Sequence, residues 1–134
     1  MGLFSKMVLC SRVEGIVTRN GEPVQGAEII QETFYRKPGD VPDVTVLTDS
    51  EGRFVLEELS QVAGFSRFIP GEVRIMQLIR IRIDNEEYVA WRHSKSSGDK
   101  NSELDGKPIK LTCELTTAAD FEGTHYGICR VAEE

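Results

Sequence analysis

The sequence predicts an all-β fold, an antiparallel two-sheet sandwich of about seven or eight strands with at most one short helix. Two observations support this prediction. Short runs in which apolar and polar residues alternate recur along the chain, and clusters of Gly, Pro, Asn and Asp separate them. The 134 residues are expected to form a single domain, 1–134, without a linker or an internal repeat.

The first half of the chain alternates short strands with turns. Strands are expected at residues 13–18, 27–35, 44–48 and 53–56. In the turns glycine permits positive backbone angles, proline withholds a ladder donor, and aspartate bonds its own backbone. A bulge or a close backbone approach is expected at Gly26. The residues expected to determine these turns and corners are Gly15, Gly21, Pro23, Gly26, Asp49 and Gly52.

The second half contains the one helical candidate and the longest strand. The run "LEELSQVAGF", residues 56–65, has apolar residues at helical spacing and ends near a glycine. Strands are then expected at 73–83, 88–92, 109–115 and 127–131, and a polar loop at 93–108. Trp91 is expected in the core, on the same strand face as Val89 and His93.

The stretches "VEGIVTRNGEPVQGAEI" and "VTVLTDSEGRFVL" together resemble the carboxypeptidase regulatory-like domain, a transthyretin-like or prealbumin-like β-sandwich. Sequences of that family carry G-x-V, a turn, G-x-P-V-x-G-A-x-V and then T-D-x-x-G-x-F. The resemblance covers roughly residues 12 to 57 and implies a transthyretin-like Greek key. Its members are mostly non-catalytic modules that support folding, adhesion or recognition. The matching residues are Gly15, Val17, Gly21, Pro23, Val24, Gly26, Ala27, Ile29, Thr48, Asp49, Gly52 and Phe54.

Charge and the N-terminal residues narrow the classes of partner. The formal net charge of -6 argues against a general attraction to nucleic acid or to an anionic membrane surface. Residues 1–10 are expected to be an N-terminal arm, because their apolar run is too short for the core of a signal peptide. A cytoplasmic location is therefore expected.

The chemical groups of the sequence do not converge on a recognisable active site. Three cysteines are too few for a dense disulfide framework, and we expect them to be separate buried thiols, although the proximity of Cys113 and Cys129 stays open. These two cysteines and His125 are weak zinc candidates, because a structural site needs four ligands in close pairs. Intradiol dioxygenases and hydroxyisourate hydrolases resemble this sandwich, but their His-x-His pair and their C-terminal tail are absent. We predict no catalytic residue and no cofactor.

One strand face has the composition of a protein interface. Arginine pairs with carboxylates while its stem packs on apolar surface, and apolar residues on an outer face favour contact with another molecule. A solvated face with cross-strand salt bridges is the alternative explanation. The hypothetical binding residues are Arg74, Met76, Leu78, Arg80 and Arg82.

A protein that acts by binding another protein is the function that these observations favour. Its most concrete form is a bacterial cytosolic immunity or adaptor protein that binds a secreted toxin or effector, as in type VI secretion. That step is an analogy from architecture. The alternatives are a structural module that forms homo-oligomers by edge-strand pairing, and a cryptic metal-dependent enzyme.

Overall fold

The computed structural model describes residues 6–35, 40–62 and 74–132, and most of these residues lie in β-strands. The strands are β1 (Lys6–Cys10), β2 (Val13–Arg19), β3 (Glu22–Pro23), β4 (Glu28–Phe34), β5 (Val44–Leu47), β6 (Arg53–Leu56), β7 (Leu59–Val62), β8 (Ile75–Ile83), β9 (Glu86–Lys95), β10 (Ile109–Glu114), β11 (Asp120–Glu122), β12 (His125–Gly127) and β13 (Cys129–Val131). A single turn of 3-10 helix, η2 (Ser102–Leu104), lies between β9 and β10.

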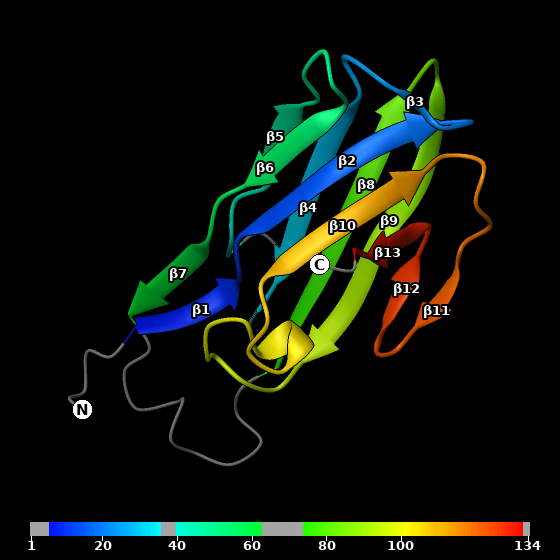
Figure 1. Ribbon diagram of the computed structural model, residues 1–134. Coiled ribbons are helices and arrows are strands. Elements are labelled where there is room, and N and C mark those ends of the chain that lie inside the picture. Colours follow the sequence, from blue (N-terminus) through cyan, green and yellow to red (C-terminus); the bar gives the residue numbers. More distant parts are fainter. Residues whose placement is uncertain (1–5, 36–39, 63–73, 133–134) are drawn as a thin grey trace.

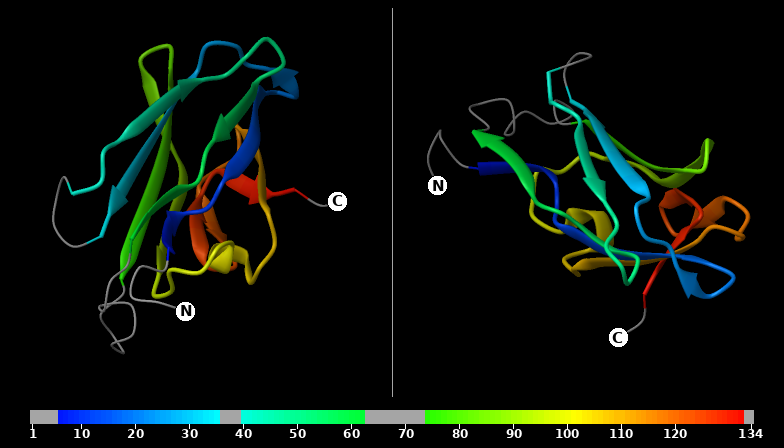
Figure 2. Two further views of the ribbon diagram at one scale, coloured as in Figure 1. Left: turned by 90° about the vertical axis from the view of Figure 1, so that its left-hand side faces the viewer. Right: turned by 90° about the horizontal axis from the view of Figure 1, so that it is seen from above.

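Two layers face each other, as predicted for a β-sandwich (Figure 1). One layer is a six-stranded sheet of order β11-β12-β9-β8-β4-β5. The other is a five-stranded sheet in which β13, β10, β2 and β3 follow one another and β6 pairs with β2. The right-hand view of Figure 2 shows the layers nearly edge-on. The pairing of β10 with β2 is parallel, whereas the other ladders are antiparallel.

A two-stranded extension replaces two elements that the sequence predicted differently. Residues 6–10, expected to be an arm, form β1 and pair with β7. The described part of the predicted helix 56–65 continues β6 and then forms β7, and residues 63–65 lie outside the described residues. Leu56 and Leu59 satisfy a helical spacing, but β6 and β7 obtain their backbone hydrogen bonds from β2 and β1 instead.

The apolar core lies between the two layers and gathers residues from both sheets. Full burial of a Val, Leu, Ile, Phe or Met side chain contributes roughly 1.5–3 kcal/mol to the free energy of unfolding, relative to leaving it exposed. Trp91 is buried, as predicted, but a register shift between β8 and β9 places Ala90 between the pairs Ile79–Trp91 and Arg80–Val89. Val89 therefore lies opposite Arg80 and not on the face of Trp91, because one bulged residue reverses the alternation. The largest fully buried members of this core are Val17, Ile29, Leu56, Ile79, Ile81 and Trp91.

The turns confirm most of the predicted corner residues. Asn20 and Gly21 both have positive φ, at 53° and 81°, and their N–H groups donate to the Glu114 carboxylate, each at 2.9 Å. The Asp49 carboxylate accepts from the Glu51 and Arg53 N–H groups and so closes the second predicted turn. These side-chain contacts fix the register of the strands on both sides.

Two glycines of the resembling motif have different physical roles. A Cβ at Gly15 would lie 2.3 Å from Cζ of Phe54, because the Phe54 ring packs on the opposite residue of β2. This pairing of glycine with an aromatic ring explains why both belong to the motif. Gly26 has φ of 81° in the bend before β4 and has no β-ladder partner. The expected bulge is therefore a bend with a positive backbone angle.

Candidate functional site

The outer face of the six-stranded sheet holds the predicted interface residues. Met76, Leu78, Arg80 and Arg82 alternate with inward residues of β8, and Arg74 immediately precedes this strand. The alternation is visible in burial, since Ile75, Gln77, Ile79 and Ile81 are buried. Placement of the five predicted residues along one face is therefore correct, but their contacts separate Arg80 and Arg82 from Met76. Leu78 lies between these two groups, opposite Glu32 of β4 and Arg92 of β9.

The first group forms an ion-pair cluster that we call the arginine ladder, made of Arg80, Arg82, Glu28, Glu32 and Glu87. Arg80 Nε lies 2.8 Å from Glu32 Oε1, and its guanidinium also bonds Glu87. Arg82 Nε lies 2.7 Å from Glu28 Oε1. The hydrogen bond with Glu87 raises the pKa of Arg80, and the bond with Glu28 raises the pKa of Arg82. Cross-strand salt bridges thus explain these two arginines without a partner protein.

The second group is apolar and aromatic, and we call it the aromatic patch: Phe34, Met76, Phe121 and Tyr126, with Arg92. Phe34 is opposite Met76, and Tyr126 is opposite Arg92. Phe34, Met76 and Phe121 are 40%, 48% and 67% exposed. Among the described residues, five large hydrophobic side chains are exposed, and these three belong to one patch. Such grouping of apolar residues on an outer face is a mark of interaction surfaces.

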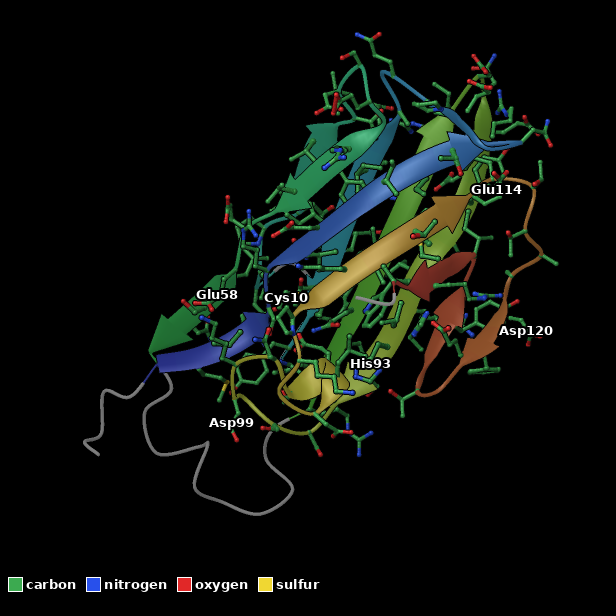
Figure 3. All side chains as sticks on the ribbon, viewed as in Figure 1. Cys10, Glu58, His93, Asp99, Glu114 and Asp120 are labelled. Carbon is green, nitrogen blue, oxygen red and sulfur yellow. A yellow bond between two sulfur atoms is a disulfide. The ribbon has the colours of Figure 1, made fainter. Side chains whose placement is uncertain are left out.

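The hairpin of β11 and β12 completes the aromatic patch from the edge of the sheet. Its rings meet edge to face, with the centroids of Phe121 and Tyr126 5.0 Å apart. The Arg92 guanidinium lies 4.7 Å from the centroid of the Tyr126 ring, a cation–π contact. Figure 3 shows Asp120, the first residue of β11, on this hairpin at the margin of the molecule.

A hollow of about 230 Å³ lies within the patch, and its lining includes Met76, Arg92, Ser94, Phe121 and Tyr126. Three larger hollows, of about 440, 420 and 580 Å³, border β10. Lys110 lines all three, and their other walls mix charged residues with apolar residues such as Leu104, Val55 and Ile109. Volume alone therefore does not identify the site, and we base it on the exposed rings.

A buried polar network lies beneath the patch end of the sheet. Gln77 Nε2 donates to Glu103 Oε2 at 2.8 Å, and Gln77 Oε1 accepts from Trp91 Nε1 at 3.0 Å. The Trp91 ring stacks on His125 of β12, with centroids 4.3 Å apart. The network therefore connects β8, which carries Met76, with β12, which carries Tyr126.

Glu103 is the centre of this network, although the sequence placed it in a polar loop. Its carboxylate accepts from the Ser11 N–H and hydroxyl and lies 3.2 Å from Lys95 Nζ. The side chains of Glu103 and Lys95 are 0% and 3% exposed. Burial alone would raise the pKa of Glu103, but the hydrogen bonds from Ser11 and Gln77 and the charge of Lys95 outweigh it and lower the pKa. Of the predicted loop 93–108, residues 93–95 instead extend β9, and Glu103 of η2 anchors the loop that follows to the interior.

The histidines and cysteines are engaged in structural contacts. Cys113 and Cys129 are directly paired across β10 and β13 and form a disulfide, which corrects the expectation of three separate thiols. His125 Nε2 bonds the Cys129 carbonyl oxygen at 2.8 Å, and burial lowers the His125 pKa. The third thiol, Cys10, is buried beside Thr33, and burial raises its pKa to about 11. The three weak zinc candidates therefore do not form a ligand set, and the described residues contain no cluster of three side chains suited to a metal ion.

The arrangement defines an all-β sandwich with an exposed aromatic patch and no convergent chemical groups among its described residues. The chain belongs to a protein family defined by a domain of unknown function, DUF6795, whose model matches residues 13–118. The match covers the arginine ladder and Met76 and ends before the hairpin of β11 and β12. Searches of curated proteins and of solved structures found no match. None of the described helical segments has the length and apolarity that crossing a bilayer requires.

Proposed function

We propose that this protein is a non-enzymatic recognition module and that the aromatic patch is its binding surface for another protein. The observation that carries the proposal is the difference in exposure on one sheet face. The arginines of the ladder are neutralised within the chain, whereas Met76, Phe34 and Phe121 are left exposed beside one another. Exposed aromatic and methionine side chains next to arginine are typical of the centre of protein interfaces.

The resemblance of residues 12–57 to transthyretin-like domains supports the proposal. The motif residues Gly15 and Phe54 pack on each other, as a corner shared with carboxypeptidase regulatory-like domains would require. Members of that family act mostly by recognition or structural support. A bacterial immunity or adaptor protein for a secreted toxin stays the most concrete form of this function, and it rests on analogy.

The disulfide favours an oxidising compartment over the cytoplasm that the sequence favoured, because disulfides between buried cysteines seldom persist in reducing cytosol. Counting thiols on denatured, unreduced protein isolated from its native cells tests this. A single reactive thiol, from Cys10, is expected. Three thiols per chain would indicate a reducing compartment.

A comparison of variants in a pull-down tests the binding surface. Tagged wild-type protein, a patch variant with Met76→Ser and Phe121→Ser, and a control with Arg82→Gln would be incubated with lysate of the native cells. We expect one stoichiometric protein to be retained by the wild type and the control and lost from the patch variant. Equal recovery on the patch variant contradicts the proposed surface. Recovery of the protein only with itself, with a mass that rises with concentration, supports the homo-oligomeric alternative.

A further inference from the structure

We infer that the aromatic patch binds an acidic protein segment, in which carboxylates flank one apolar anchor residue. This inference rests on the proposed function and specifies the chemistry of the partner. It follows from three features: Arg74 and Arg92 have no carboxylate partner among the described residues, Arg92 is held in one direction, and the hollow between the rings is small.

Charge pairing separates Arg74 and Arg92 from most other arginines of the described chain. Arg12, Arg19, Arg53, Arg80 and Arg82 each lie within 3.4 Å of an Asp or Glu oxygen. Arg130 instead donates to backbone carbonyls. Within the described residues, neither Arg74 nor Arg92 has a carboxylate or hydrogen-bond partner for its guanidinium. In a chain with 22 acidic and 16 basic residues this pattern is not expected from composition.

Arg74 and Arg92 lie next to the exposed apolar residues of the aromatic patch. Arg74 precedes β8 on the same face as Met76, and Arg92 lies beside Met76 in the lining of the hollow. The Arg92 contact with the Tyr126 ring holds the guanidinium against the patch, while its N–H donors have no acceptor among the described residues. A guanidinium prepared in this way favours a bidentate bond with a carboxylate. Arg74 and Arg92 place two positive charges beside the patch, in a chain whose net charge is -6.

The hollow suits a side chain better than a small molecule. Its volume of about 230 Å³ is below the roughly 300–1,000 Å³ that is typical of small-molecule sites. Met76, Phe121 and Tyr126 supply apolar walls, and methionine adapts its shape to the residue that enters. An aliphatic or aromatic anchor with carboxylates beside it would satisfy both the walls and the arginines.

A peptide selection tests the inference separately from the proposed function. A phage-displayed random peptide library would be selected on immobilised wild-type protein, and the enriched peptides would be measured by fluorescence anisotropy on purified variants. We expect enriched peptides to carry Asp or Glu around one apolar residue. Their affinity should fall at least about tenfold on Arg92→Gln, should fall with rising salt, and should be unchanged on the ladder control Arg82→Gln.

The outcomes of this selection distinguish the proposed binding surface from the inferred acidic chemistry of its partner. Enriched peptides without acidic residues, lost on Met76→Ser with Phe121→Ser but retained on Arg92→Gln, would overturn the inference and leave the proposed surface standing. Peptides that bind the Met76→Ser and Phe121→Ser variant as well as they bind the wild type would overturn both. A library that yields no enriched peptide also contradicts both. Circular dichroism and melting of each variant must match the wild type, so that lost binding reports the surface and not the fold.

Discussion

The two ends of one sheet face differ in almost every physical respect. At the ladder end, Arg80 and Arg82 are bonded to glutamates of the neighbouring strands, and the residues beneath them are aliphatic, such as Ile79 and Ile81. At the patch end three outer residues are apolar and exposed, and a hydrogen-bonded polar network lies beneath them beside the buried Ile75. The usual arrangement, polar outside and apolar inside, is thus interrupted at one end.

This difference supports the proposal that the patch end, and not the ladder end, contacts another molecule. A ladder over an aliphatic interior needs no partner, because its charges are satisfied within the chain. A buried network holds Trp91 and His125 in fixed positions through directed contacts, and these residues lie on the strands that carry the patch. A rigid support of this kind lowers the entropy that a binding surface loses when it meets its partner. Substitutions at the two ends are therefore expected to lower the free energy of unfolding by different amounts.

The largest effect on stability is expected from Glu103→Ala. The substitution leaves Lys95 buried without its carboxylate and removes the acceptor of Ser11 and Gln77, so unfolding free energy should fall by roughly 3–5 kcal/mol. Chemical denaturation with matched slopes measures it. Glu28→Ala on the ladder is the control and should cost less than about 1 kcal/mol. Equal costs for the two substitutions would remove the distinction between the ends.

Loss of the disulfide should have the next largest effect. The double substitution Cys113→Ala with Cys129→Ala should lower the unfolding free energy by about 3 kcal/mol, because the bond closes a loop of sequence separation 16. Amide hydrogen exchange should accelerate in β12 and β13 more than in β4 and the ladder part of β8. Uniform acceleration throughout both sheets would show that the disulfide does not act preferentially on the patch end.

Acid should weaken the patch end before the ladder end. The folded pKa of His125 lies below its ordinary value of 6.5, so below about pH 6.5 the unfolded chain binds more protons and stability falls. The lowered pKa of Glu103 adds a second loss as pH falls below about 4.5 and through its folded pKa. Denaturation curves at pH 7, 5.5 and 3.5 would measure both stages. A His125→Phe variant should lose the first stage, and Arg82→Gln should keep it.

The smallest effect is expected on the ladder itself. Arg82→Gln removes one exposed ion pair and should lower the melting temperature only slightly, and less at high salt. Melting temperatures at low and high ionic strength measure this difference. A loss that is large and independent of salt would show that the ladder contributes to the fold more than its exposure suggests.

The arginines of the ladder could be predicted from the sequence because they alternate with apolar residues within one strand. The alternation of residues 73–83 and the turn after it identify the strand and its outward arginines. Glu87, from the strand after the turn, lies opposite Arg82 in the strand register and bonds Arg80 in the arginine ladder. The corner residues were also predictable, since positive backbone angles at Asn20 and Gly21 restrict residue choice. Such features depend on neighbours within one strand or turn.

The patch was only partly predictable because its members are distant in the sequence. Met76 was identified, but Phe34, Phe121 and Tyr126 come from other strands, and nothing in a three-residue strand such as β11 signals its pairing. The disulfide pairing depends on the antiparallel pairing of β10 with the three-residue strand β13, which sequence spacing does not reveal. Glu103 lies in a run of polar residues, and only its contacts with Ser11 and Lys95 show that it is buried.

The central claim is that the patch end of this sheet face, and not the ladder end, contacts another protein. Site-specific photocrosslinking tests it most directly, with p-benzoylphenylalanine in place of Phe121 or, as the matched control, in place of Leu47. Leu47 lies opposite Glu28 at the ladder end and is 62% exposed, close to the 67% of Phe121. After irradiation of the native cells, we expect one heavier crosslinked adduct for position 121 and none for position 47. An adduct at 47 with none at 121 would contradict it.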